Sequence, residues 1–469
     1  MARVRTSSDL ELLVELRRDD PEPLHRQLEQ GLRAAVRSGR LDAGAVMPST
    51  RALAVQLGVS RGIVVEAFEQ LVAEGYLASR PGGTTTVART SARTSTDAER
   101  PAPAALRFDF RPGRPDLDQF PRAVWLRAVR RVLSGAPSQR FGYLDGRGTP
   151  ELRRAIAAYM NRVRGTAADP EHVIVSAGFA QGLSLVAHAI RTTGAIRMAL
   201  EDPSDPEYRA AVRAAGHEPV GIPVDASGLR VDLLDAADVD AVLVTAAHQY
   251  PTGGVLPPDR RSALIAWAER RGALIVEDDY DAEFRYDREP IGALQGLSPD
   301  RVVYSGSASK ILAPGLRLGW LVAPTRMVDA LAAAKIAADM GSATLDQLAF
   351  ADIVERGELD HHLRRMRPIY RRRRDVLLES LARRLPSLRP VGASAGLHVL
   401  AWLPPDADER RIVEAAAHEG IGIAGLSARW FETGPGGLIF GYGGITEGAI
   451  DDGIRQLAEV ITGVAASRG

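Results

Sequence analysis

Four short apolar runs between residues 197 and 304 each stop abruptly at a polar cluster. "RMAL" runs into Glu201-Asp202-Pro203, "AVLVTAA" into "HQYPTGG", "ALIV" into "EDDYDAEFRY" and "RVVY" into "SGSASK". Helical patterns separate these runs, and strands that alternate with helices form mainly parallel α/β sheets. Ligands of doubly wound sheets bind beyond the carboxyl ends of the strands. The pattern therefore predicts an α/β domain over residues 108–469, in which the four polar clusters converge on one site.

The composition narrows the class of protein further. With 469 residues, 45% hydrophobic and 25% charged, the chain is long enough for two or three domains with sizeable cores. It has no cysteine, which excludes disulfides, thiolate metal sites and a cysteine nucleophile, and we assign no metal ligand. No signal sequence or membrane-spanning run is present, so we expect a cytoplasmic protein without a membrane partner. The formal net charge is zero, so any nucleic-acid binding must come from a local patch.

Residues 21–88 form a separate patterned zone in front of the α/β domain. Leu24, Leu28, Leu32 and Val36 recur every four residues, which predicts an amphipathic helix. A second helix is predicted over residues 49–58, with Ser49 as its cap. Residues 89–107, rich in Ser, Thr, Pro and Ala, have no hydrophobic period and are predicted to be a linker.

The same zone continues with a third helix and a hairpin. Residues 60–75 predict a helix capped by Ser60, and "YLASR-PGG-TTTVA" predicts two short strands around a turn. This order is that of a winged helix-turn-helix, whose third helix would place Ser60 and Arg61 in the major groove. Arg80 lies beside the tip of the wing. The alternative is a small helical module for protein interaction.

Lysine is nearly absent from this chain, and one of its two lysines stands in the last polar cluster. The sequence holds 59 Lys and Arg residues, of which only Lys310 and Lys335 are lysines. A desolvated lysine can become a free amine and condense with a carbonyl, whereas arginine keeps its proton. We expect this role for Lys310, and for Lys335, in the Ala-rich "LAAAKIAADM", a place on the surface.

The surrounding clusters supply what a pyridine aldehyde phosphate bound to Lys310 would need. Asp278 can pair with the ring nitrogen, and Tyr280 can donate to the ring oxygen. The phosphate needs backbone N–H groups, hydroxyls and an arginine; these are expected from Gly178, Phe179, Ala180, Ser307, Ser309 and Arg317. Taken singly, "EDDYD" is more often a solvated acidic turn or a metal loop, and "PTGG" only a turn. Their joint order and spacing point to pyridoxal 5′-phosphate.

Two parts of the sequence resemble known families. "GRLDAGAVMPSTRALA" followed by "LGVSRGIVVEAFEQLVAEGYL" resembles the DNA-binding domain of the GntR family of bacterial regulators. The resemblance implies that DNA is approached by Ser49, Thr50, Arg51, Ser60, Arg61, Gly82 and Gly83. Residues 141–444 resemble the fold-type-I aminotransferases, carried by "AAHQYPTGGVLPPDRR", "EDDYDAEFRY" and "SASKILAPGLRLGW".

Together the two parts resemble the MocR/GabR family of regulators that depend on pyridoxal phosphate. The resemblance implies a winged helix, a linker, a fold-type-I domain and a smaller C-terminal α+β lobe. It makes Lys310 the Schiff-base lysine and Arg429 the arginine that grips a ligand carboxylate, with Arg209 as a second anion contact. Tyr143 corresponds to a tyrosine that reaches the phosphate of the partner subunit's cofactor, which implies a homodimer.

The sequence departs from the family pattern at several positions. Tyr250 stands where related aminotransferases have Asn before "PTG", so one hydrogen bond to the ring oxygen is either absent or made instead by His248 or Gln249. Asp205 stands where the family usually has an aromatic residue. His248 itself is expected to be structural. The basic run "LRRMRPIYRRRR" (363–374) is interpreted as a solvated helix face or subunit interface, with a second DNA-contacting surface as the alternative.

These observations predict a transcription regulator that binds a double-stranded DNA operator. Its effector would be a small amine, an amino acid or pyridoxal phosphate itself. The rival hypothesis is a working aminotransferase with an appended DNA-binding domain, since all residues for transamination are present. A regulator that has lost the cofactor conflicts with the retained Lys310, Asp278 and Arg317.

Overall fold

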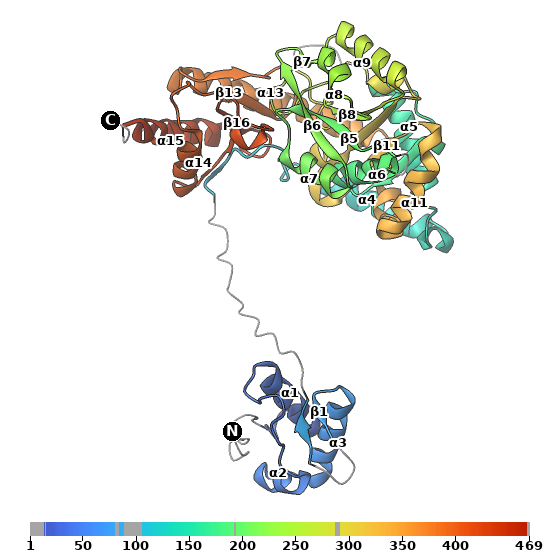
Figure 1. Cartoon of the computed structure of the whole chain (residues 1–469), viewed down its shortest axis with the longest axis vertical. Helices are drawn as coiled ribbons and strands as arrows, with labels where there is room; N and C mark the ends of the chain where they lie inside the picture. Colours follow the sequence, from blue (N-terminus) through green and yellow to red (C-terminus); the bar gives the residue numbers. More distant parts are fainter. Residues whose placement is uncertain are drawn as a thin grey trace. The chain divides into compact units, whose positions relative to one another are not determined.

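The computed structural model describes residue 14 and residues 16–79, 84–88, 106–191, 194–286 and 291–466. The chain divides into two units, Met1–Pro103 and Ala104–Gly469 (Figure 1). Arg80, Gly82 and Gly83, expected at the wing, lie outside the described residues. Among the helices that the structure describes, none has the length and apolar content needed to span a membrane.

The first unit has the element order of a winged helix-turn-helix. Its elements are α1 (Leu24–Arg37), α2 (Thr50–Gln56), α3 (Arg61–Ala73), β1 (Leu77–Ala78) and β2 (Thr86–Val87). The two strands are antiparallel, with Leu77 opposite Val87. The apolar faces of the three helices meet in one core, which contains Leu28, Leu53 and Phe68. The prediction of three helices and a hairpin is confirmed.

Of the two serines predicted to cap helices of this unit, one makes the expected hydrogen bond and the other does not. The Ser49 side chain accepts a hydrogen bond of 3.2 Å from the backbone N–H of Ala52, which caps α2. Ser60 occupies the N-cap position of α3, but its side chain makes no capping hydrogen bond. The prediction that Ser60 is the N-cap residue is therefore confirmed, but the expected hydrogen bond from its side chain is absent.

The second unit is built on a large sheet that is mainly parallel. Its strands are β4 (Val173–Ser176), β5 (Arg197–Asp202), β6 (Glu218–Asp225), β7 (Gly228–Leu229), β8 (Ala241–Val244), β9 (Leu274–Asp278), β10 (Val302–Ser307) and β11 (Gly319–Val322). Their order in the sheet is β4-β11-β10-β9-β8-β5-β6-β7 among the described residues. The neighbours from β6 to β10 pair in parallel, while β11 is antiparallel to β10 and β4. The four apolar runs of the sequence are therefore four adjacent parallel strands, as predicted.

Helices cover both faces of this sheet. The helices before the C-terminal lobe are α4 (Arg122–Gly135), α5 (Pro150–Arg164), α6 (Phe179–Arg191), α7 (Pro206–Ala214), α8 (Leu234–Ala237), α9 (Pro258–Arg271), α10 (Ala308–Ile311), α11 (Val328–Asp339) and α12 (Thr344–Glu355). One apolar cluster joins α6, α7 and α11 to one face, and another joins α9 to the opposite face. Burial of both faces explains why the strands are continuous apolar runs rather than alternating ones.

A smaller lobe completes the unit and packs against the large sheet domain (Figure 1). The long helix α13 (Glu358–Arg384) leads into it, and its other elements are β12 (Arg389–Val391), β13 (His398–Trp402), α14 (Glu409–His418), β14 (Ile421–Gly422), β15 (Ala424–Gly425), β16 (Gly437–Gly441) and α15 (Glu447–Ala466). The order β12-β13-β16-β15 is antiparallel throughout. The strand β14 pairs in parallel with β3 (Phe108–Asp109), which ties the start of the unit to its end. The α+β lobe is as expected.

Lys335 is buried rather than on the surface. Only 1% of this residue is exposed, and its ammonium donates hydrogen bonds to Asp339, one helical turn on, and to Ser342 at 2.9 Å. A Lys–Asp pair four residues apart is common on solvent-exposed helix surfaces. In this protein, however, neighbouring elements of the second unit bury the lysine. The expectation of a surface lysine is wrong, and the residue has a structural role.

Candidate functional site

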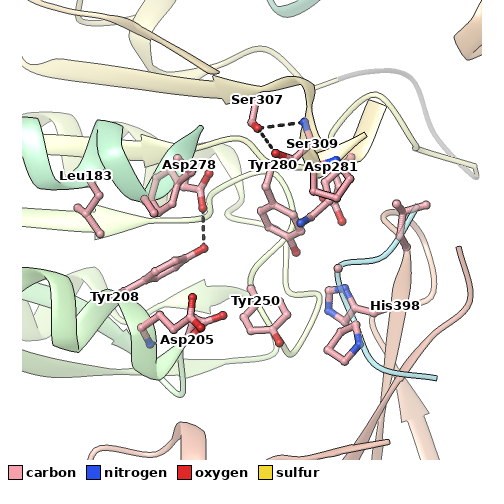
Figure 2. Close-up of a pocket in the computed structure, with 18 of the residues that line it drawn as sticks. Leu183, Asp205, Tyr208, Tyr250, Asp278, Tyr280, Asp281, Ser307, Ser309 and His398 are labelled. Atoms are coloured by element: carbon pink, nitrogen blue, oxygen red, sulfur yellow. Dashed lines mark hydrogen bonds between the residues drawn. The ribbon is translucent and has the colours of Figure 1, made fainter. Parts of the chain in front are cut away.

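A cavity of about 350 Å³ opens beyond the carboxyl ends of β5, β8, β9 and β10 (Figure 2). Its lining consists of Pro112, Gly113, Phe179, Ala180, Leu183, Asp205, Glu207, Tyr208, Ala211, Tyr250, Asp278, Tyr280, Asp281, Ser307, Ser309, Lys310, Pro314, Arg317, Leu397 and His398. Three of the four polar clusters contribute side chains to this lining, and after the first cluster, Glu201-Asp202-Pro203, the lining residue is Asp205, two positions on. The predicted convergence on one site is confirmed, and we call this cavity the cofactor pocket.

Lys310 enters the cofactor pocket from α10, the short helix that directly follows β10. Burial lowers the pKa of its ammonium, and the Asp278, Asp281 and Asp205 carboxylates only partly oppose this effect. A Cβ atom added to Gly113 would lie 3.3 Å from the Lys310 nitrogen, so the glycine leaves room at the amine. The site therefore favours the free-amine form that attack on a carbonyl requires.

Asp278 ends β9 and is buried at the floor of the cofactor pocket. Burial raises the pKa of its carboxyl group to about 8, and the hydroxyl of Tyr208 donates to it at 2.8 Å. Sequence reasoning missed Tyr208, which comes from the first turn of α7. Its ring lies 5.0 Å from that of Phe179, so these two rings form an aromatic wall. Asp205, where the family usually has an aromatic residue, instead accepts from the N–H of Glu207 and caps α7.

The other end of the cofactor pocket has the features of a phosphate site. Gly178 has a φ of +89° just before α6, whose first N–H groups have no partner within the helix. A Cβ atom there would lie 3.2 Å from a guanidinium nitrogen of Arg317, which also donates to the carbonyl of Ala177. Ser307 donates to the hydroxyl of Ser309 at 2.8 Å and accepts from its N–H at 3.1 Å. This end of the cavity is thus surrounded by small residues, two hydroxyl groups and one arginine. None of these residues is acidic, as a phosphate site requires.

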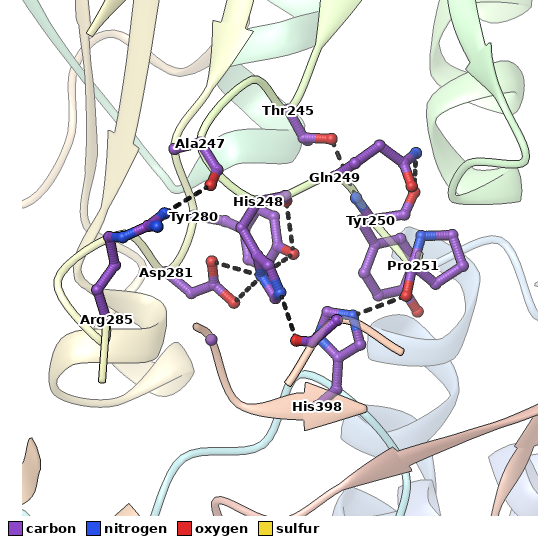
Figure 3. A network of polar contacts seen from close by, with 12 residues as sticks. Thr245, Ala247, His248, Gln249, Tyr250, Pro251, Tyr280, Asp281, Arg285 and His398 are labelled. Atoms are coloured by element: carbon purple, nitrogen blue, oxygen red, sulfur yellow. Dashed lines mark hydrogen bonds and ion pairs between the residues drawn. The ribbon is translucent and has the colours of Figure 1, made fainter. Parts of the chain in front are cut away.

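A buried polar network supports the side of the cofactor pocket at Tyr280 (Figure 3). The Tyr280 hydroxyl donates to the carbonyl of His248 at 3.0 Å, and the His248 ring pairs with Asp281 at 3.1 Å. Burial by itself would lower the pKa of the His248 imidazole. The Asp281 carboxylate and the Gly392 carbonyl have the larger combined effect, so the pKa is raised above its ordinary value. Burial and the neighbouring His248 hold the pKa of His398 well below its ordinary value.

This network also ties the two lobes together. The Nε2 atom of His248 lies 3.2 Å from the carbonyl of Gly392, and that of His398 lies 3.2 Å from the carbonyl of Pro251. Asp281 and the two imidazoles offer ligand atoms within 4.8 Å of one another, a spacing that a metal ion could use. The ion pair and the carbonyls already engage these groups, so the geometry favours a structural network and fits the expected role of His248.

Four predicted residues, Gly178 and the three discussed next, are not among the described residues that line the cofactor pocket. Arg429 donates to the hydroxyl of Tyr250 through Nε at 3.3 Å and Nη2 at 3.1 Å. Arg209 donates to the carbonyls of Trp430 and Ala428 at 2.6 and 2.7 Å. This arrangement does not support a direct ligand contact for Arg209, because its guanidinium holds the loop that carries Arg429. Tyr143 is 90% exposed.

The five predicted DNA-contacting residues that the structure describes lie at the starts of two helices of the first unit. Ser49, Arg51, Ser60 and Arg61 are exposed at the starts of α2 and α3, and Thr50 is half-buried. Arg61 donates to the hydroxyl of Thr50 at 3.3 Å, which joins the two helix starts. These helix starts thus present two guanidinium groups and several hydroxyls, a combination suited to phosphate and base contacts.

Comparison with known proteins gives two family matches on this chain. Residues 109–430 match the model "Aminotransferase class I and II", and residues 24–87 match "Bacterial regulatory proteins, gntR family". Similar relatives include the HTH-type pyridoxine biosynthesis transcriptional regulator PdxR of Corynebacterium glutamicum, 35% identical over 96% of this chain and 99% of its own length. The probable rhizopine catabolism regulatory protein MocR of Rhizobium meliloti is 32% identical over 96% of both chains. The chain belongs to the MocR/PdxR-type transcriptional regulators.

Solved structures similar to this regulator include several aminotransferases. The multiple substrate aminotransferase of Thermococcus profundus has a TM-score of 0.71 and 27% identity, over 78% of this chain and 93% of its own. LysN, the α-aminoadipate aminotransferase of Thermus thermophilus, has a TM-score of 0.70 and 25% identity, over 76% and 93% of the two chains. Its structure is a complex with N-(5′-phosphopyridoxyl)-L-leucine. This regulator binds DNA and depends on pyridoxal 5′-phosphate.

The residues of the cofactor pocket fit this cofactor. A Cβ atom on Gly113 or Gly178 would crowd the Lys310 amine or the Arg317 guanidinium, so both positions keep space open. Asp278 is a buried carboxylate without a cationic hydrogen-bonding partner among the described residues, which suits a protonated ring nitrogen. When bound, pyridoxal phosphate supplies an aldehyde and an electron-withdrawing pyridine ring.

Proposed function

We propose that the second unit senses pyridoxal phosphate or a small amine through Lys310 and thereby controls DNA binding by the first unit. The observation that carries this proposal is an amine of lowered pKa beside a buried carboxylate, on a chain that also carries a winged helix. In this scheme Lys310 holds the aldehyde, Asp278 the ring nitrogen and Tyr280 the ring oxygen. The phosphate lies among Ser307, Ser309, Arg317 and the start of α6, at Gly178, Phe179 and Ala180.

The DNA contacts and the dimer belong to the same proposal. Arg51 and Arg61 reach the operator, with Ser49, Thr50 and Ser60 beside them. The exposed ring of Tyr143 is free to reach the cofactor phosphate of a second subunit. Two winged units of a homodimer would then read two half-sites, which predicts a (pseudo)palindromic operator.

Footprinting of the DNA upstream of the regulator's own gene tests this proposal. Full-length protein is expected to protect a site there, and pyridoxal phosphate or an effector amine is expected to change the affinity. For such a response the ligand must bind the DNA-bound and free forms with different affinity. Protection that no ligand alters, together with steady release of a keto acid and regeneration of the cofactor, would favour the rival aminotransferase instead.

The hydroxyl of Tyr250 argues against an α-amino acid as the preferred effector. It occupies the Nε–Nη2 edge of Arg429, one of the two edges that can bind a carboxylate in the bidentate manner, and Nη1 at the other edge donates to the carbonyl of Gly425. The guanidinium also lies 5.7 Å from the centre of the Tyr250 ring. A ligand carboxylate would have to displace this hydroxyl, whereas pyridoxal phosphate or a simple amine would not.

Tyr250→Phe is therefore expected to increase the affinity for glycine by about tenfold, because a hydrogen bond to a charged group contributes about 1.5–3 kcal/mol. Methylamine, which lacks the carboxylate, is the matched control and should bind both proteins equally. Titration of the cofactor absorbance with each ligand measures this. An equal change for both ligands would show that Tyr250 shapes the cofactor pocket generally and does not select against carboxylates.

A further inference from the structure

A second cavity, of about 460 Å³, lies between the end of α5, the start of α13 and the segment that follows β9. Five of its lining residues are arginines: Arg162, Arg164, Arg285, Arg364 and Arg367. Only two acidic residues, Glu283 and Asp360, line it as far as the described residues show. We call it the arginine cavity. None of its lining residues belongs to the cofactor pocket.

The positive charge of the arginine cavity is only partly neutralised. Arg162 pairs with Asp360 at 2.7 Å, and the buried Arg164 pairs with Asp279 at 2.6 Å. Arg367 donates to the backbone carbonyl of Glu283 at 2.8 Å, a contact that leaves its charge uncompensated. Burial, followed by the nearby Asp279, raises the pKa of the Glu283 carboxyl group, which disfavours its negative charge.

We propose that the arginine cavity binds a small phosphate-bearing anion. Guanidinium groups match phosphate oxygens in a bidentate manner and are less strongly hydrated than ammonium groups, so arginine is suited to this role. The cavity volume lies within the range of small-molecule sites. The basic run 363–374 thus contributes Arg364 and Arg367 to a concave site, which neither interpretation of that run foresaw.

One segment connects the arginine cavity to the cofactor pocket. Asp278 and Tyr280 line the cofactor pocket, while Glu283 and Arg285, a few residues on, line the arginine cavity. Between them, Asp279 accepts from Arg164. Arg285 also donates to the carbonyl of Ala247, next to His248 of the polar network, at 3.3 Å. A phosphate that forms hydrogen bonds with Arg164 and Arg285 would therefore shift the segment that follows β9. That segment carries Asp278 and Tyr280, which line the cofactor pocket.

Calorimetric titration of the full-length, cofactor-loaded protein tests this proposal. The probes are inorganic pyrophosphate and ATP, each added at constant ionic strength. Arg364→Gln is expected to weaken binding of the probe by about tenfold or more, since it removes a charged hydrogen-bond donor to the phosphate. The control is Arg371→Gln, an exposed arginine of the same helix outside the cavity lining, which should change the affinity by less than about twofold.

The outcomes separate the possible sources of the phosphate. Tighter binding of ATP would identify an organic phosphate ligand, and preference for pyrophosphate an inorganic one. Absence of binding by either probe at millimolar concentration would overturn the proposal, as would an equal loss in Arg364→Gln and Arg371→Gln. Binding should persist in Lys310→Ala, because that lysine does not line the arginine cavity. Failure of the proposed function would therefore leave this result unchanged.

Discussion

Replacing Lys310 with alanine is expected to abolish covalent capture of pyridoxal phosphate and the ligand response of DNA binding. Borohydride should attach no pyridoxyl group to this variant, whereas the wild type should be yellow, bleach with borohydride and keep the reduced group on Lys310. Lys310→Arg should behave in the same way, because arginine keeps its proton and cannot condense with the aldehyde. DNA binding without ligand should survive both changes, since the winged helix forms a unit of its own. Absorbance spectra and footprinting with and without cofactor measure these effects.

Lys335→Ala is the matched control for this experiment, because Lys335 is the other lysine of the chain. It should keep the colour and the ligand response. Loss of its buried contacts with Asp339 and Ser342 should lower the free energy of unfolding by about 1–3 kcal/mol. A Lys310→Ala protein that still carries a covalently attached pyridoxyl group after borohydride reduction would contradict the assignment of Lys310.

Asp278→Asn should change cofactor retention and protein stability in opposite directions. The amide cannot hold a positive ring nitrogen, so the cofactor should dissociate at least about tenfold more readily. The cofactor-free protein should become more stable, because burial raises the pKa of the Asp278 carboxyl group to about 8 and its ionised form is costly. A merely structural role would not produce opposite signs.

The pH dependence gives a second test of the same residue. Between about pH 4 and pH 8 the folded state holds a proton on Asp278 that the unfolded state has released, so the free energy of unfolding falls as the pH rises through this window. Asp278→Asn should reduce this slope in thermal denaturation of the cofactor-free protein at pH 5 and pH 8. Asp205→Asn is the control, since asparagine can still cap α7. If both variants reduce the slope equally, or neither does, Asp278 is not the group that holds this proton in the folded state.

The sequence was sufficient to predict the parts of the site that depend on strand order. Lys310, Asp278 and Tyr280 each follow a continuous apolar run, and adjacent parallel strands bring their carboxyl ends to one edge. The prediction that Gly178 lies at the phosphate end used a local feature as well, small residues at a helix start, and in the structure this glycine has a positive φ just before α6. Strand ends and helix starts can be predicted because they depend on residues that are close together in the sequence.

Contacts between distant segments could not be predicted in this way. Tyr208 stands one turn after Asp205, and only the packing of α7 shows that its ring reaches Asp278. Tyr250 and Arg429 are 179 positions apart in the sequence. The residues around either one give no sign that the two side chains are in contact. Lys335 has the spacing of an exposed ion pair, and its burial comes from other elements of the unit.

Mass spectrometry after borohydride reduction tests the central claim most directly. The full-length protein is incubated with pyridoxal phosphate, reduced and digested, and the peptides that carry the pyridoxyl phosphate group are identified. With only two lysines in the chain, the result is unambiguous. We expect one group per chain, on Lys310. Label on Lys335 alone, or no label at all, would contradict the view that this regulator holds its cofactor through Lys310.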